Sequence, residues 1–308
     1  MSGNATRVLI LGHGAMGRAF ETLLASRHDV AIWDRDLATG VETEPLEQAV
    51  QGREVVVFAM PTDPHDELAQ RLAASAADGL ACFSIAKGLD KQGRTPAQIF
   101  ERNFGSRIGW GLIYGPMLAR ELQAGRAGFA MVASARPDIG RRIIALFNDS
   151  ALRLEYLNDV HGAAWAAILK NVYVPLIGAA EGLGLGDNLR GFLMTEATRE
   201  LGLIAEHMGG RRETAYTLSG LGDLVTSATS ASSHHRHIGA ELAAGRTGEL
   251  AASGVNIRSE GIHTTTIVRE QAVFDWERFP LFALVCNFLR DPAQLEKQMA
   301  DYFTHRFP

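Results

Sequence analysis

The stretch RVLILGHGAMGRAF, residues 7–20, decides the fold class of this 308-residue chain. Its apolar run VLIL has the length of a strand, and the segment that begins at Arg18 has helical spacing. The turn between them satisfies G-x-G-x-x-G, in which the first glycine permits a tight turn, the second lets a pyrophosphate approach the backbone and the third lets helix and strand pack closely. The sequence therefore predicts a dinucleotide-binding turn with a helix N-terminus facing the phosphates, in preference to a plain strand–helix turn. The three glycines are Gly12, Gly14 and Gly17.

The residue that would meet the adenosine ribose is expected about 20 positions after this motif. Asp34 follows the apolar run Val30–Trp33 and ends the second expected strand. A carboxylate at this position accepts hydrogen bonds from a free ribose 2′-OH and repels a 2′-phosphate, whereas the next residue, Arg35, would welcome the phosphate. We predict NAD as the cofactor, with NADP as the alternative. If no cofactor binds here, Asp34 and Arg35 would simply lie in a solvent-exposed turn.

The first half of the chain alternates apolar runs with helically spaced segments, which is typical of a doubly wound α/β domain with strands buried on both faces. After about Asn158 the strand signals stop and the helical candidates become longer. We therefore expect an α/β domain over residues 1–158 and an all-α domain over 159–308. The expected strands are Arg7–Gly12, Asp29–Trp33, Glu54–Met60, Leu80–Ser84, Trp110–Tyr114 and Phe129–Ala133; the expected helices are Arg18–Ser26, His65–Ala74, Pro96–Asn103, His161–Glu181, Asn188–Gly209, His235–Ala244, His263–Glu277 and Phe282–Phe303, with a polar loop at Ser227–Ser233.

Composition excludes several classes of protein. Thirty basic and thirty-five acidic residues give a net charge of −5, which argues against nucleic acid as a partner. Cys82 and Cys286 both sit in apolar runs, which predicts two buried reduced thiols. We find no run of about 18 unbroken apolar residues and no separate apolar region of a signal peptide, so we expect a cytoplasmic protein without membrane insertion. A helical second domain leads us to expect a homodimer.

Five further blocks of sequence occur in this order along the chain: SIAKGLD (Ser84–Asp90), GPMLARELQAG (Gly115–Gly125), LKNVYVPLIGAAEGLGLGDN (Leu169–Asn188), LSGLGDLVTSATS (Leu218–Ser230) and SEGIHTT (Ser259–Thr265). From about residue 7 to about 270 the chain resembles the NAD(P)-dependent glycerol-3-phosphate dehydrogenase family. The resemblance implies a Rossmann-type N-terminal domain, a helical C-terminal domain, and hydride transfer between NADH or NADPH and dihydroxyacetone phosphate, or the reverse reaction from sn-glycerol 3-phosphate.

The resemblance also implies roles for individual residues. Lys170 matches the general acid/base, Asp223 the carboxylate that orients it, and Lys87 a lysine that contacts substrate. The chemistry is reasonable, because burial in the apolar stretch Ala163–Ile177 and a nearby cation such as Lys87 would lower the pKa of Lys170 toward neutrality. Periodicity alone favours a snorkelling lysine on a helix surface. Further implied substrate contacts are Gly115, Asn171, Ser227 and Ser233; further implied cofactor contacts are Ala15, Met16, Trp33, Pro61, Lys87, Ala119 and Glu260.

Two departures from the family pattern affect the substrate side. His234 and His235 stand where the family grips the substrate phosphate with Arg-Asn, although a two-residue slip would bring Arg236 there. Histidine offers less charge and no bidentate fork. Met117 stands where a small polar residue usually touches substrate, and methionine cannot replace that hydrogen bond. These changes suggest a relative retuned to another anionic ketone, such as a phosphonate or keto acid. A non-catalytic NAD-binding regulator on the same scaffold is a second alternative, which the presence of Lys170 and Asp223 disfavours.

The same histidines also raise the question of a metal site. His234 and His237 are spaced i, i+3, but Cys, Asp and Glu are not close in sequence, as most zinc sites require. We therefore expect no metal, and we favour a substrate-facing role for His234, His235 and Arg236 over a solvated loop.

Overall fold

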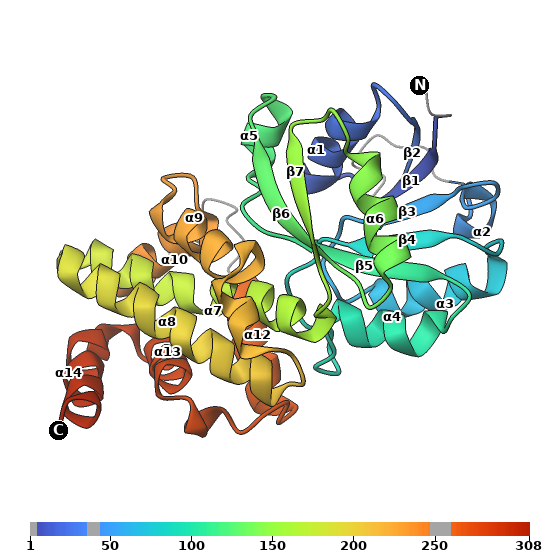
Figure 1. The fold of residues 1–308 in the computed structure, drawn as a ribbon. Helices are drawn as coiled ribbons and strands as arrows, with labels where there is room; N and C mark the ends of the chain where they lie inside the picture. Colours follow the sequence, from blue (N-terminus) through green and yellow to red (C-terminus); the bar gives the residue numbers. More distant parts are fainter. Residues whose placement is uncertain (1–4, 36–43, 247–259) are drawn as a thin grey trace. The chain divides into compact units, whose positions relative to one another are not determined.

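The computed structural model describes residues 5–35, 44–246 and 260–308. The chain divides into two compact units, the first comprising Met1–Asp90 and Arg94–Ala164 and the second Lys91–Gly93 and Trp165–Pro308. The first unit is built on a β-sheet flanked by helices and the second from helices (Figure 1). The predicted combination of a doubly wound α/β fold and an all-α region is confirmed.

The sheet of the first unit has the strand order β2-β1-β3-β4-β5-β6-β7. Strands β1 to β5 run parallel, whereas β6 is antiparallel to β5 and β7 is parallel to β6. The order reverses between β1 and β3, which is where open α/β sheets bind ligands beyond the carboxyl ends of their strands. The strands are β1 (Arg7–Leu11), β2 (Asp29–Trp33), β3 (Val55–Phe58), β4 (Ala81–Ser84), β5 (Gly109–Tyr114), β6 (Gly128–Ala133) and β7 (Leu152–Leu157).

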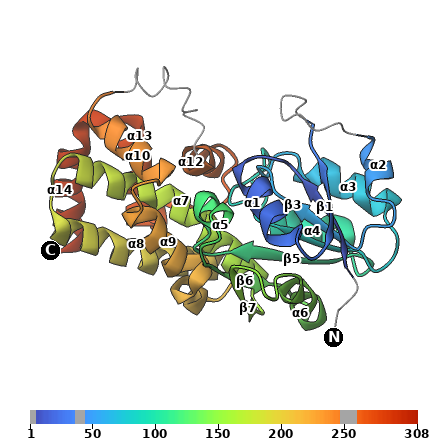
Figure 2. The same cartoon turned by 90° about the horizontal axis from the view of Figure 1, so that it is seen from above.

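Helices cover both faces of this sheet because the central strands are apolar on both sides. On one face α1, α5 and α6 pack into a core with Ile10, Val57 and Ile113; Figure 2 shows α1 and α5 as neighbours there. On the other face the Phe58 ring lies 4.9 Å from that of Phe100 on α4. The helices are α1 (Ala15–Leu24), α2 (Leu46–Ala49), α3 (His65–Ser75), α4 (Pro96–Phe104), α5 (Ala119–Gln123) and α6 (Pro137–Leu146).

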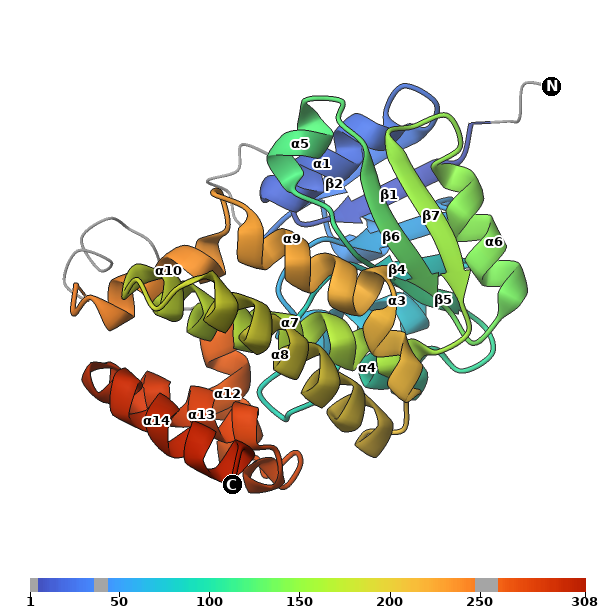
Figure 3. The same cartoon turned by 60° about the vertical axis from the view of Figure 1, so that its left-hand side comes forward.

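The second unit is arranged around α7, which is buried along its whole apolar length. By length and composition α7 is also apolar enough to cross a membrane, but its burial identifies it as the core helix of this unit. Figure 3 shows α14 beside α13 at the C-terminal end. The helices are α7 (Val160–Gly182), α8 (Asp187–His207), α9 (Asp223–Thr229), α10 (His234–Ala243), α12 (Glu260–Glu270), α13 (Pro280–Arg290) and α14 (Leu295–Arg306), with single turns at Arg212–Tyr216, Leu218–Gly222, Trp276–Arg278 and Pro292–Gln294.

Glycines let two helices approach the backbone of α7 closely. A Cβ at Gly239 of α10 would overlap the Pro175 carbonyl of α7, and one at Gly261 of α12 would overlap the Asn171 carbonyl. Pro175 has no N–H to donate to the Asn171 carbonyl four residues earlier, so one hydrogen bond of α7 is missing at the carbonyl that Gly261 of α12 approaches. The absence of side chains at positions 239 and 261 therefore fixes how α10 and α12 sit on α7.

Several predicted elements are corrected by the structure. The helix expected over His263–Glu277 ends at Glu270, and the one expected over Phe282–Phe303 is interrupted, because a residue before proline avoids the helical region and Asp291 precedes Pro292. The loop expected at Ser227–Ser233 begins inside α9. Strand β7 was missed, since LRLEYL mixes charged with apolar residues as half-buried edge strands do.

A cluster around Glu196 ties the last helix of the chain to α8. Arg306 of α14 donates to the Glu196 carboxylate at 3.0 and 3.2 Å, and Arg199 donates at 2.9 Å. Burial raises the pKa of Glu196, but the hydrogen bonds from Arg306 and Arg199 outweigh burial and lower it to about 2. A carboxyl whose pKa falls on folding stabilises the folded state above its ordinary pKa, and this contribution is lost as the pH falls toward 2.

Replacing Gly239 by Ala should lower the free energy of unfolding by about 1–3 kcal/mol, because the added methyl must push α10 away from α7. Urea unfolding measures the change. The matched control is Gly191→Ala, since a Cβ at this exposed position of α8 meets no atom within 4 Å; alanine there should be neutral or stabilising by up to about 1 kcal/mol. Equal effects at the two sites would contradict the close packing.

Glu196→Gln should lower the free energy of unfolding at pH 7 by about 2 kcal/mol, a figure reduced because the two arginines are partly exposed. The difference from the unchanged protein should shrink as the pH is lowered from 5 to about 3, because the native carboxylate then loses its advantage. Urea unfolding over this pH range tests both points. Glu206→Gln, on the exposed face of the same helix, is the control and should show neither effect; a loss that does not depend on pH would rule out the ionic cluster as the cause.

Candidate functional site

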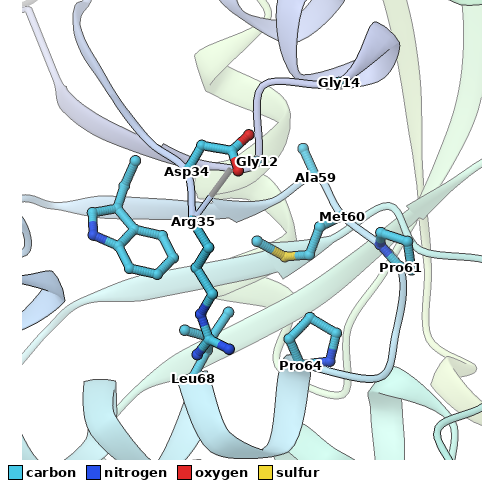
Figure 4. Close-up of a pocket in the computed structure, with 10 residues that line it drawn as sticks. Gly12, Gly14, Asp34, Arg35, Ala59, Met60, Pro61, Pro64 and Leu68 are labelled. Atoms are coloured by element: carbon cyan, nitrogen blue, oxygen red, sulfur yellow. The ribbon is translucent and has the colours of Figure 1, made fainter. Parts of the chain in front are cut away.

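A cavity of about 350 Å³ opens beyond the carboxyl ends of β1, β2 and β3. Figure 4 shows residues from the ends of these strands and from the start of α3 around it. The cavity coincides with the reversal of strand order, the position at which a dinucleotide is expected in a sheet of this kind. Its walls are formed by Gly12, Gly14, Trp33, Asp34, Arg35, Ala59, Met60, Pro61, Pro64 and Leu68.

The glycine turn has the geometry that a bound pyrophosphate requires. Gly12 has φ +95°, and a Cβ there would lie 2.8 Å from the Ala59 carbonyl oxygen, so only glycine fits. Gly14 ends the turn at the N-terminus of α1, which is not capped by any described side chain, and a Cβ on Gly14 would meet open space. Backbone N–H groups at this helix end are therefore placed to bind an anion. The residues present fit a dinucleotide.

Asp34 and Arg35 leave the end of β2 in opposite directions (Figure 4). The Asp34 carboxylate turns to the glycine loop and accepts a hydrogen bond of 2.7 Å from the His13 N–H. The Arg35 side chain extends toward α3, where it pairs with Glu67 at 2.5 Å. The Asp34 carboxylate therefore holds the glycine turn, while Arg35 lines the cavity.

Lys87 lies in a loop that is braced from two sides. The Lys87 Nζ donates to the Gly115 carbonyl oxygen at 3.4 Å. The preceding backbone is held by the Tyr114 hydroxyl, which donates to the Ala86 carbonyl at 2.7 Å, and by Ser84 Oγ, which accepts from the Ala86 N–H at 3.1 Å. Sequence reasoning missed Tyr114, because an aromatic residue within an apolar strand is typical of a core position.

His65 also supports this loop. Its Nε2 lies 2.8 Å from Ser84 Oγ and its Nδ1 lies 3.1 Å from the Pro61 carbonyl oxygen. Burial lowers the pKa of His65 to about 3, so the imidazole is neutral and connects the cavity wall at Pro61 to the strand that leads to Lys87. A histidine at the start of an amphipathic helix gave no signal of this role in the sequence.

In the second unit, Lys170 on α7 contacts two residues of α9. Its Nζ lies 2.8 Å from Ser227 Oγ and 3.4 Å from Asp223 Oδ1. Asp223 and Ser227 are four residues apart and therefore lie on one face of the helix. Lys170 is only 6% exposed, so a lysine snorkelling to solvent is wrong for this position. The structure joins three of the residues singled out in the sequence.

The next residue of α7 bonds to a different helix. Asn171 Nδ2 donates to Glu260 Oε2 at 3.0 Å, which connects α7 to the first residue of α12. Two neighbouring residues of α7 thus reach α9 and α12. Glu260 was assigned to the cofactor in the sequence; the contact described is with Asn171, and its role toward a cofactor stays a prediction.

The residues expected to bind the substrate anion have other partners in the structure. Arg236 forms a two-pronged ion pair with Glu181, including 2.6 Å from Nε to Oε2. Ser233 caps α10 by accepting from the Arg236 N–H at 3.4 Å. Met117 is 6% exposed and packs in the apolar core of the first unit. Because the Arg236 guanidinium is paired with Glu181, an anion approaching Arg236 would also meet the negative charge of the Glu181 carboxylate.

The remaining predicted residues lie as follows. His234 and His235 open α10, with ring centroids 6.0 Å apart. Partial burial, and then the neighbouring His237, lowers the pKa of His234. Within residues 5–35, 44–246 and 260–308, no three His, Cys, Asp or Glu side chains are grouped closely enough to hold a metal ion. Ala15, Met16 and Gly17 form the first turn of α1, Trp33 ends β2, Pro61 follows β3, and Ala119 opens α5.

Two family models match most of the chain. The model described as NAD-dependent glycerol-3-phosphate dehydrogenase N-terminus matches residues 39–139, and the corresponding C-terminus model matches residues 159–300. All five sequence blocks that carry the resemblance lie within these two ranges, whereas the glycine turn at residues 12–17 precedes the first of them.

Individual proteins similar to this chain are also named as glycerol-3-phosphate dehydrogenases. A glycerol-3-phosphate dehydrogenase [NAD(P)+] of Cupriavidus necator is 30% identical over 318 residues, covering 92% of this chain and 94% of that protein. Glycerol-3-phosphate dehydrogenase [NAD(P)+] 2 of Sphingopyxis alaskensis is 29% identical and covers 85% of each chain. The crystal structure of the glycerol-3-phosphate dehydrogenase of Coxiella burnetii superposes with a TM-score of 0.85 at 24% identity, over 97% of this chain and 99% of that one, and so shares the fold. The chain belongs to the NAD(P)-dependent glycerol-3-phosphate dehydrogenase family.

Proposed function

We propose that this protein is an NAD(P)-dependent dehydrogenase that reduces dihydroxyacetone phosphate to sn-glycerol 3-phosphate, or catalyses the reverse reaction. The observation that carries the proposal is Lys170 held by Asp223 and Ser227, in a chain that also has a cavity fitted to a dinucleotide. Family membership supports the substrate and the cofactor, since the relatives are named for both.

Ketone reduction needs a hydride donor and a proton donor. The nicotinamide supplies the hydride when the cofactor is bound. The Lys170 ammonium gives a proton from Nζ to the oxygen of the former carbonyl, and in the oxidation the neutral amine takes it back. Asp223 keeps Nζ in place and stabilises its charged form. Ser227 Oγ accepts a hydrogen bond from Nζ and thereby orients the amine. We assign Lys87, Asn171 and Gly115 to the substrate on the strength of the family pattern.

The substrate side has a second candidate function. His234 and His235 replace an Arg-Asn pair, and Arg236 is neutralised by Glu181. These observations favour a less highly charged anionic ketone, such as a phosphonate or a keto acid. Purified protein should be assayed for NADH and NADPH oxidation with dihydroxyacetone phosphate, its phosphonate analogue and small 2-keto acids. Highest kcat/KM with dihydroxyacetone phosphate supports the main proposal, and highest kcat/KM with another ketone supports the second. If the protein bound a reduced cofactor but turned over none of these ketones, the result would instead indicate a non-catalytic NAD-binding regulator.

We also propose that the enzyme works as a homodimer in the cytoplasm without membrane insertion. Burial of the apolar α7 within the protein supports the last point, since its side chains pack against the protein itself.

Lys170→Ala should lower kcat by about 10³-fold, in the range expected when a general acid is lost, while the dissociation constant for NADH changes less than about twofold. Steady-state turnover and a fluorescence titration of NADH measure the two effects. The control is Lys297→Ala on the exposed surface of α14, which should retain full turnover. Near-normal turnover of the Lys170 variant would sink the acid/base assignment.

Asp34→Ala should weaken NADH binding relative to NADPH about fivefold, because it removes an acceptor for the ribose hydroxyl and a charge that repels a 2′-phosphate. Both cofactors should also bind more weakly, since the His13 N–H loses its partner in the phosphate turn. Titration of each reduced cofactor measures the ratio. An unchanged ratio would mean that another group decides the preference.

A further inference from the structure

A chain of four charged side chains runs from the cofactor cavity across α3 to α2. Glu67 of α3 pairs with Arg35 at 2.5 Å and with Arg71 at 3.5 Å. Arg71 in turn donates to both oxygens of Glu47 at 2.7 and 3.0 Å. Only Arg35 of these four lines the cavity, so Glu67 is the residue that connects the cavity to the rest of the chain.

Both guanidinium groups lie near the ring of Trp33, which forms part of the cavity wall. The Arg35 Cζ is 5.9 Å and the Arg71 Cζ 6.0 Å from the ring centroid, and the ring itself is 6% exposed. The two arginines thus place two positive charges beside the end of β2. A positive group at this place attracts a 2′-phosphate, and Glu67 offsets it.

We propose that Glu67 is a specificity-determining residue that shifts the preference from NADPH toward NADH by holding and neutralising the Arg35 guanidinium. The inference rests on the proposed function, since it concerns the cofactor of that same cavity. A 2′-phosphate would have to compete with the Glu67 carboxylate for Arg35 and would also meet its negative charge. A free ribose hydroxyl carries no charge and meets neither obstacle.

The state of Glu67 agrees with this role. The hydrogen bond from Arg35 is the main cause that lowers the pKa of Glu67, so the carboxylate is charged at neutral pH. The side chains of Arg35 and Glu67 are 47% and 55% exposed. Exposed ion pairs contribute little to stability, so Glu67→Gln is expected to fold normally and to alter the cavity's charge alone.

Direct titration of NADH and NADPH with the full-length protein, followed by fluorescence, tests the proposal. Glu67→Gln should tighten NADPH relative to NADH about tenfold at low ionic strength, because removing one charge from the neighbourhood of a doubly charged phosphate roughly 6 Å away changes binding by about this factor in water. The gain should shrink at 0.5 M salt, where such charges are screened.

Two further variants identify the cause of any shift. Glu47→Gln removes the same charge from the far end of the chain of ion pairs, where the carboxylate contacts Arg71 and does not line the cavity; it should leave the cofactor ratio unchanged within twofold. Adding Arg35→Gln to Glu67→Gln should abolish the gain for NADPH, since the freed guanidinium is then absent.

The proposal is overturned if Glu67→Gln changes the two dissociation constants equally, or if the gain persists without Arg35 or in the Glu47 variant. These titrations require cofactor binding but no turnover, so their failure is distinguishable from failure of the dehydrogenase assignment. Absence of binding by both cofactors to the unchanged protein would overturn the proposed function and this inference together, whereas binding without catalysis would overturn the function alone.

Discussion

An ammonium group inside the buried, apolar helix α7 is the constraint around which the second unit is organised. Burying an ammonium is costly unless it is paired and hydrogen-bonded. Lys170 is satisfied by Asp223 and Ser227, which reach it from one face of α9. The short helix α9 must therefore be held against α7 in the one position that places both Asp223 and Ser227 beside Lys170. The residues that perform the proposed chemistry are thus also the ones that make a charged α7 tolerable.

The first unit couples its parts through backbone contacts at the glycine turn. The Gly12 N–H donates to the Trp33 carbonyl oxygen at 2.8 Å, and the His13 N–H donates to Asp34 at 2.7 Å. The end of β2 and the phosphate turn are therefore one hydrogen-bonded piece. On the roles proposed for Asp34 and the glycine turn, a change in Asp34 also changes the loop expected to bind the phosphates, and cofactor preference is then linked to cofactor affinity. On the proposal made for Glu67, Arg35, which points away from this piece (Figure 4), is the residue through which cofactor preference alone can be altered.

Local patterns in the sequence were enough to predict strands β1 to β6, the glycine turn and the helices α7 and α8. The family resemblance also anticipated that Asp223 belongs with Lys170, whereas Ser227 was expected to contact the substrate. The structure places Ser227 beside Lys170 as well, because it shares one face of α9 with Asp223. The sequence could not show contacts that depend on distant packing. Arg236 and Glu181 are 55 positions apart and pair because Gly178 and Gly239 let α7 and α10 approach. His65 and Ser84 are likewise joined by the sheet and by no local pattern.

These distant contacts matter most for recognition of the substrate anion. A free arginine at the start of α10 would supply a permanent charge and a bidentate fork, but Arg236 directs its fork to Glu181. The neighbouring His234 has a lowered pKa, so at neutral pH its imidazole offers one directional hydrogen bond and no charge. On the proposed function, an anion at this end of α10 is selected more by hydrogen-bond geometry than by net attraction. Such a site gives a doubly charged phosphate little advantage over a less highly charged anion, which is why a phosphonate and a carboxylate compete with the phosphate as substrates to be tested.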